Sequence, residues 1–175
     1  MKKKFLLIIG ILALILFFTP KGIYEKYYYD FLEWKTLRDK IVWKENIKLN
    51  RKDFKSTESG ENLVLYAKVG LSIRYFTNPI MFESKTVFVP KESFLKTEND
   101  SISLRISEAK FNLLEIYRRK METYVKNLKK ENIDTLKKVD FNTLNLKYYE
   151  LFETEWEKYL DSQNETESLE NLERK

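Results

Sequence analysis

The sequence predicts an α+β domain, in which a small antiparallel sheet packs on a long amphipathic helix and a C-terminal helix, behind an N-terminal hydrophobic helix. Two regions, residues 61–76 and 80–89, alternate apolar and more polar side chains, as strands with one buried face do. Two later regions, residues 103–128 and 142–160, repeat apolar residues every three or four positions, which is typical of helices. Strands that are followed by helices, instead of alternating with them, favour an antiparallel sheet.

The first 22 residues predict a signal peptide or a signal anchor. A basic start precedes an uncharged apolar run from Phe5 to Phe18. As a helix this run would be ~21 Å long, against about 30 Å of bilayer hydrocarbon, which suits a cleaved signal peptide. However, no pair of small residues for cleavage follows, and flanking lysines and aromatic residues can hold a short membrane anchor in place. Both interpretations stay open.

The leader also sets the expected location of the protein. Lysines at the start of a membrane segment stay on the cytoplasmic side, so the rest of the chain is expected outside the cytoplasm. An uncleaved leader predicts a single-pass membrane protein of the cell envelope, which contacts the membrane through its N-terminal segment. A cleaved leader predicts a secreted or periplasmic protein.

Three further regions are expected after the leader. Residues 23–40 predict an aromatic amphipathic helix, residues 41–160 the α+β domain, and residues 161–175 a flexible polar tail. The apolar face of the first of these helices comprises Ile23, Tyr27, Phe31, Trp34, Leu37 and Ile41.

Within the α+β domain, two short strands are expected before the long ones, at residues 41–43 and 47–49. Gly70 interrupts the first long strand region and marks a position where the strand can bend or bulge. Pro90 ends the second long strand region, because proline cannot donate to the hydrogen-bond ladder of a sheet.

Composition excludes several kinds of chemistry. The chain has no histidine and no cysteine, so imidazole and thiolate catalysis, disulfides and cysteine or histidine metal sites are not possible. The formal charge is +5, and subtracting the four lysines at positions 2, 3, 4 and 21 leaves +1 for the rest. Because acids and bases alternate there instead of forming a basic face, nucleic acid is not an expected partner.

One segment resembles a known family. Residues 106–121 read ISEAKFNLLEIYRRKM, which resembles the helix of the bacterial domain of unknown function 922. Exported members of that family carry H-E-x-x-H-F, then an acid, then Y-x-R-K. The two histidine positions fall on Ile106 and Lys110, and the glutamate position falls on Ser107. The matching positions in this helix are Phe111, Glu115, Tyr117, Arg119 and Lys120.

Two upstream segments extend the resemblance over roughly residues 41–125. In residues 42–55, Trp43, Leu49, Asp53 and Phe54 match the opening of the family pattern, whereas Arg51 replaces a usual tryptophan. Residues 93–96, SFLK, resemble the Ser-Trp-Val-Lys that precedes the family's helix.

The resemblance implies a degenerate zincin-like fold that has lost its chemistry. The H-E-x-x-H motif works because residues four apart share one side of a helix and direct two imidazoles at one zinc ion, while the glutamate activates the metal's water. Here Ile106 has no lone pair, Lys110 repels a cation, and Ser107 is a poor general base. We therefore expect a pseudoenzyme without metal or cofactor: an exported, membrane-tethered binding or scaffold domain with a protein partner in the envelope.

Alternatives to that expectation remain. One alternative hypothesis is a structural or assembly factor of the envelope that is unrelated to peptidases. It would bind through the early aromatic helix. An enzyme would need a Ser–Lys pair or paired carboxylates. Spacing offers Ser93 with Lys96, Ser107 with Lys110, and Glu108 with Glu115, but solvated side chains are the commoner outcome for all of these in so charged a sequence. For Lys110, that simpler outcome includes an ion pair with Glu108 or Asp53.

Overall fold

The structure is a computed structural model, and it describes residues 21–56, 64–77, 80–96, 101–131 and 133–161. The chain separates into two compact units between Arg38 and Asp39. The hydrophobic run between Phe5 and Phe18 and the polar tail beyond Asp161 lie outside the described residues. Within those residues, no helix is long and apolar enough to span a bilayer.

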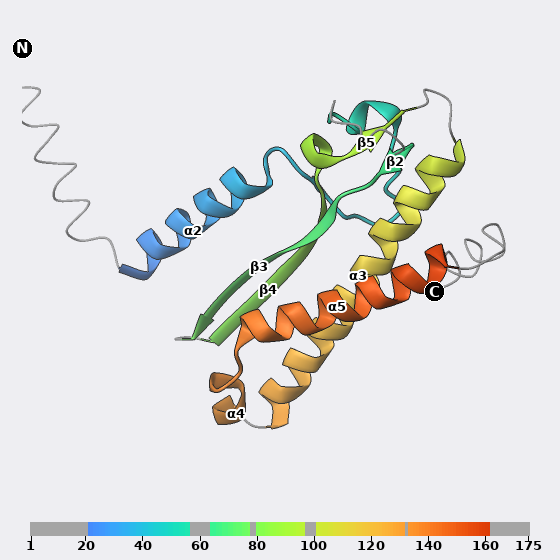
Figure 1. The fold of residues 1–175 in the computed structure, drawn as a ribbon. Helices are drawn as coiled ribbons and strands as arrows, with labels where there is room; N and C mark the ends of the chain where they lie inside the picture. Colours follow the sequence, from blue (N-terminus) through green and yellow to red (C-terminus); the bar gives the residue numbers. More distant parts are fainter. Residues whose placement is uncertain (1–20, 57–63, 78–79, 97–100, 132, 162–175) are drawn as a thin grey trace, which may run out of the picture. The chain divides into compact units, whose positions relative to one another are not determined.

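The first unit contains helix α2, Lys21–Leu37 (Figure 1). The helix confirms the helical periodicity of this region but ends before residue 40, and Ile41 belongs to a strand instead. Sheet pairing explains the difference, because Ile41 pairs with Phe88, and tertiary hydrogen bonds override local periodicity. Aromatic rings contact one another along α2: Phe31 stacks on Trp34 at 5.8 Å between centroids.

The second unit is an α+β domain, as expected, with an antiparallel hairpin at its centre (Figure 1). Strands β3, Val69–Thr77, and β4, Ile80–Phe88, pair along their whole length. The short strand β1, Ile41–Val42, joins the other edge of β4, which gives the order β1-β4-β3. A separate two-stranded sheet pairs β2, Leu65–Tyr66, with β5, Phe94–Leu95.

The prediction of one continuous strand at residues 61–76 is wrong. Its described part divides at Ala67 and Lys68 into β2 and β3, which belong to different sheets. At the division the chain changes its partner strand from β5 to β4, and the Ser93 hydroxyl accepts a hydrogen bond from the Lys68 backbone N–H at 3.0 Å. Gly70, which was interpreted as a position where the strand can bend or bulge, pairs regularly with Val87.

The strand expected at residues 47–49 is also wrong. The chain turns through Glu45 and Asn46, and Asn46 adopts a left-handed conformation with φ 60°. Beyond the turn, the Leu49 N–H donates to the Glu108 carboxylate at 2.9 Å, in place of a neighbouring strand. Short one-turn helices follow at Arg51–Asp53 and, after β4, at Pro90–Glu92.

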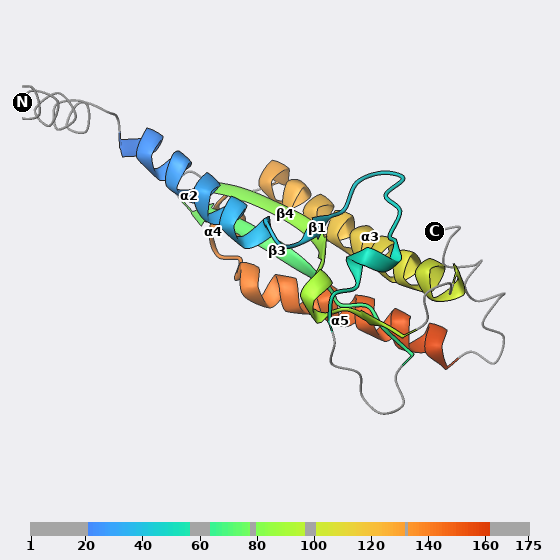
Figure 2. The same cartoon turned by 90° about the horizontal axis from the view of Figure 1, so that it is seen from above.

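Both predicted domain helices are confirmed, each slightly longer than expected. Helix α3 covers Ser101–Glu131 and α5 covers Phe141–Leu160, with the short α4, Ile133–Lys137, between them. Figure 2 shows the sheet hairpin with α3 and α5 from above. Asp140 caps α5 by accepting from the Asn142 N–H at 2.9 Å, which satisfies one of the free N–H groups at the helix start.

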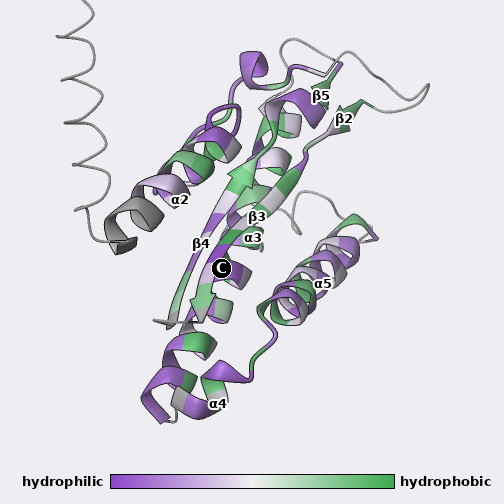
Figure 3. Cartoon of the chain, turned by 90° about the vertical axis from the view of Figure 1, so that its left-hand side faces the viewer, coloured by the Kyte–Doolittle hydropathy of each residue, from purple (hydrophilic) through white to green (hydrophobic). Residues whose placement is uncertain are grey.

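One face of the hairpin packs against the helices and forms the core. Strand residues two apart share a face, and this face carries Phe82 and Phe88 of β4. The Phe88 ring contacts Phe111 of α3 at 6.2 Å, and the Phe82 ring stacks on Phe141 of α5 at 5.2 Å. In Figure 3, α5 carries both hydrophobic and hydrophilic residues, as an amphipathic helix does. Full burial of a ring, as for Phe88 and Phe111, stabilises the domain by about 1.5–3 kcal/mol.

Candidate functional site

Helix α3 presents two different chemical environments on two of its sides. With 3.6 residues per turn, Ile106 and Lys110 share one side. Glu108, Glu115 and Arg119 share another side, roughly opposite. The contacts agree with this division: Lys110 lies against α5 and β2, whereas Glu108 and Arg119 contact the segment around Trp43.

The Ile106 side contains the positions that the resemblance assigns to a zinc motif. Ile106 is half-buried and packs against the main core cluster. Ser107 is fully buried, and its hydroxyl donates to the Ser103 carbonyl one turn earlier at 2.8 Å. Such a bond back to the helix is a structural role for serine.

The Lys110 side chain lies near aromatic rings from two different elements. Its ammonium nitrogen lies 5.3 Å from the ring centroid of Trp156 on α5 and 6.0 Å from that of Tyr66 on β2. Both distances are within the range in which the negative face of a ring attracts a cation. Zinc does not fit this set of residues, because Ile106 has no donor atom and the Lys110 ammonium has no lone pair.

Burial lowers the pKa of Lys110, and the nearby positive charge of Lys68 lowers it further, while the Glu153 carboxylate acts in the opposite direction. Burial, and then Glu153, raise the pKa of the neighbouring Tyr149 phenol. Within the described residues, no three acidic side chains converge as metal ligands would. An ammonium, an acid and two rings therefore share the side of α3 on which the resemblance implies a metal.

The expected Lys110 ion pairs are wrong. The Glu108 carboxylate instead accepts from the Lys48 ammonium at 3.2 Å and from the Leu49 N–H. Asp53 accepts from the Asn50 N–H at 2.9 Å, at the start of its own one-turn helix. Both acids thus have partners other than Lys110, and the described contacts of the Lys110 ammonium are with the rings of Trp156 and Tyr66.

The Ser93–Lys96 pair has no dyad geometry. Ser93 is fully buried, and its hydroxyl donates to the Val89 carbonyl at 2.8 Å while accepting from the Lys68 N–H. The hydroxyl is thus committed to the backbone junction between β2 and β3, and Lys96 is exposed. The role of Ser93 is therefore structural, like that of Ser107.

The other side of α3 gathers three positions that match the family pattern. The Arg119 guanidinium lies over the Trp43 ring at 4.9 Å from its centroid. The Trp43 indole N–H donates to the Asn112 side-chain oxygen at 2.8 Å. The Arg119 Nε in turn donates to the Glu115 carboxylate at 2.7 Å. Trp43, which is distant in sequence from α3, therefore forms one connected cluster with Glu115 and Arg119.

Glu115 anchors this cluster inside the protein. It is 4% exposed, and it accepts from the Thr86 hydroxyl at 2.8 Å and from Arg118 at 2.6 and 2.8 Å. Burial alone would raise the pKa of Glu115, but hydrogen bonds from Arg118, Arg119 and Thr86 hold it below the ordinary carboxyl value. A buried carboxylate with this many donors stays ionised and fixes the arginines.

The remaining family-matching positions do not join the cluster. Phe54 and Phe111 both contact Phe88 in the core. The Tyr117 hydroxyl donates to Glu155 of α5, and the Lys120 ammonium lies 4.3 Å from the Tyr117 ring centroid. These residues link α3 to the sheet and to α5, so their roles are packing and helix docking.

A groove of about 430 Å³ opens beside the Trp43–Arg119 contact. It combines apolar side chains, both signs of charge and amide groups, and the segment from Trp43 to Lys48 forms one wall while α3 forms the other. Its lining residues are Trp43, Glu45, Asn46, Ile47, Lys48, Glu108, Asn112, Glu115, Ile116 and Arg119. Sequence reasoning missed this groove, because the turn at Asn46 was not predicted and the chain that follows it is not the strand expected at residues 47–49.

Comparisons of the chain with protein-family models, curated proteins and solved structures give no significant match. The resemblance to domain of unknown function 922 thus rests on the residues quoted for it.

Proposed function

We propose that this chain is an exported, membrane-tethered, non-catalytic domain that binds a protein partner in the cell envelope, on a degenerate metallopeptidase-like fold. The observation that carries the proposal is the placement of Lys110. Its ammonium lies between the Trp156 and Tyr66 rings, on the side of α3 where the resemblance implies a metal. A positively charged lysine side chain at this position, beside Ile106, supports the proposal that the domain has lost its metal chemistry and kept its fold.

The groove beside Trp43 is the surface that we assign to the partner. Trp and Arg are the residues most enriched where binding energy concentrates, and here Glu115 and Asn112 hold them in place before any partner arrives. A groove with an apolar residue, Ile47, next to paired charges suits an extended peptide segment that carries both apolar and charged side chains. We therefore propose a segment of a partner protein as the occupant.

Crosslinking from inside the groove tests this assignment. A photoreactive residue at Ile47, in the full chain in its own envelope, should give a discrete protein adduct. The adduct should fall roughly tenfold when Arg119→Ala removes the guanidinium over Trp43, because a central interface residue contributes about 1.4 kcal/mol or more. Mass spectrometry and quantitative blotting measure both results.

The matched control places the photoreactive residue at Leu146, which is 59% exposed on α5. The assignment predicts no shared adduct from Leu146. The same adduct from both positions, or an Ile47 adduct that Arg119→Ala leaves unchanged, contradicts the groove as the binding surface.

A second candidate function is a structural or assembly factor of the envelope that binds through α2. The observation that favours it is the exposure of the aromatic residues: Tyr27 is 69% exposed, and Tyr28 and Trp34 are each 58% exposed. Such a concentration of exposed rings on one helix marks a contact with a partner or with a membrane interface.

A photoreactive residue at Tyr28 distinguishes the two contacts that α2 can make. The assembly-factor function predicts protein adducts from Tyr28. Adducts with lipid alone contradict it and indicate a membrane-interface helix instead. The Ile47 experiment in the same cells shows which of the two surfaces holds the protein partner.

A further inference from the structure

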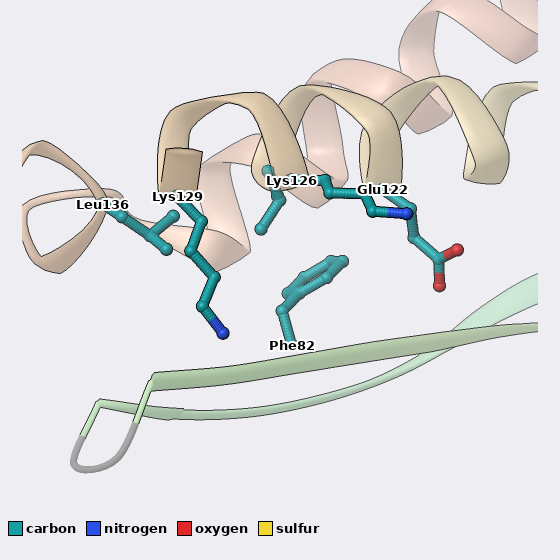
Figure 4. A pocket seen from close by; sticks show the side chains of 6 residues that line it. Phe82, Glu122, Lys126, Lys129 and Leu136 are labelled. Atoms are coloured by element: carbon teal, nitrogen blue, oxygen red, sulfur yellow. The ribbon is translucent and has the colours of Figure 1, made fainter. Parts of the chain in front are cut away.

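A second cavity, of about 300 Å³, lies between β4 and the C-terminal half of α3, next to α4. Figure 4 shows Phe82 on the strand side, facing the helix that carries Lys126 and Lys129, with Leu136 at the α4 side. The lining residues are Phe82, Glu122, Val125, Lys126, Lys129 and Leu136. None of them belongs to the groove beside Trp43.

The interior of this cavity is apolar and preorganised. Val125 and Leu136 are buried, at 5% and 0% exposure, and belong to the second core cluster. The Phe82 ring is fixed by stacking on Phe141 with 25° between the ring planes. An apolar group that enters the cavity meets surfaces already in place, so it gains burial without ordering the protein.

The rim of the cavity has an excess of positive charge. The Glu122 carboxylate accepts from the Ser84 hydroxyl at 2.9 Å and pairs with Arg118 at 2.5 Å, so its charge is already balanced. Lys126 and Lys129 are exposed, and within the described part of the chain neither makes an ion pair or a hydrogen bond. Residues three apart on a helix are neighbours, and Figure 4 shows Lys126 extended toward Glu122 and Lys129 extended toward the strands, so binding of one anion would draw these two flexible side chains together.

We propose that this cavity binds a small amphipathic anion, a carboxylate or another acid group attached to a short acyl chain or an aromatic ring. The acid group would lie between Lys126 and Lys129, which can both donate charge-assisted hydrogen bonds, and the apolar part would contact Phe82 and Val125. A volume of about 300 Å³ is at the small end of ligand sites, which favours a free anion over a diacyl lipid. The proposal is independent of the function assigned to the groove.

The test uses 4-phenylbutyrate as the anion and 4-phenylbutan-1-ol as its neutral counterpart, with the full chain in nanodiscs of zwitterionic lipid. Methyl NMR signals of Val125 and Leu136 report occupancy. The anion should shift both signals saturably and bind at least roughly tenfold more tightly than the alcohol, because only the anion gains the two ammonium contacts.

The double variant Lys126→Gln/Lys129→Gln should lose about tenfold in affinity for 4-phenylbutyrate and keep the methyl spectrum of the free protein. Lys130→Gln is the matched control, because Lys130 is exposed on the same last turns of α3 but does not line the cavity. It should leave the affinity unchanged.

Three results overturn the proposal: no saturable shift, equal affinity for the anion and the alcohol, or equal losses in the double variant and in Lys130→Gln. Shifts of the same methyl signals when phosphatidylglycerol is added to the nanodiscs, without 4-phenylbutyrate, contradict a free small anion as the ligand.

Discussion

Replacing Glu115 by glutamine should destabilise the domain by about 3 kcal/mol at neutral pH. Removing one member of a buried ion pair leaves its partners without compensation, which costs several kcal/mol when the partners are themselves buried. Arg118 would keep its pair with Glu122, and Arg119 is largely exposed, so the loss is expected near the lower end of that range. The free energy of unfolding from urea titration measures it.

The loss of stability caused by Glu115→Gln should become smaller as the pH falls. The folded-state pKa of Glu115 is lowered, so its contribution is complete above the unfolded pKa of about 4.3 and is lost as the pH falls through the folded value. The difference between the wild-type protein and Glu115→Gln should therefore be constant near pH 7 and shrink in strong acid.

Glu150→Gln is the control for this prediction, because Glu150 is exposed on α5 and should change the stability by less than about 0.5 kcal/mol. Equal losses in the two variants would mean that the contacts of Glu115 contribute no more than a surface charge. A difference that persists unchanged at the lowest pH would exclude ionisation of Glu115 as its cause.

The main elements of the domain were predictable because they extend over many periods. The apolar pattern of α3 and the alternation in β3 and β4 repeat often enough to dominate local exceptions. The break between β2 and β3 was not predictable, because the apolar alternation continues past Ala67 while the pairing partner changes from β5 to β4. Similarly, Leu49 lies in a strand-like run but donates to Glu108 on a helix.

The candidate sites were predictable only in part, for the same reason. The spacing of Ile106 and Lys110 in the sequence is enough to predict that they lie on one side of α3. The rings that surround Lys110 come from β2 and α5, and no local pattern connects Tyr66 or Trp156 to α3. The Trp43–Arg119 contact likewise depends on the pairing of β1 with β4, which places Trp43 beside the helix.

The proposal that α3 is a former metal-binding helix predicts that the helix accepts a metal when the ligands are restored. In the variant Ile106→His/Lys110→His, two imidazoles share one side of α3, as metal ligands four residues apart do. Glu153, whose charge already acts on Lys110, supplies an acid on the neighbouring α5. Ser107 stays unchanged, because a carboxylate at that fully buried position would cost more than it could contribute.

We expect this variant to retain one zinc ion per chain after dialysis, measured by elemental analysis, whereas the wild-type protein should retain none. Leu146→His/Glu150→His is the control, since it places two histidines four apart on the exposed face of α5. The pair on α3 should bind zinc at least about tenfold more tightly than this control, and Glu153→Gln should remove most of the difference. Equal affinities of the two histidine pairs would show that the Lys110 region is no former metal site, and stoichiometric zinc in the wild-type protein would overturn the pseudoenzyme itself.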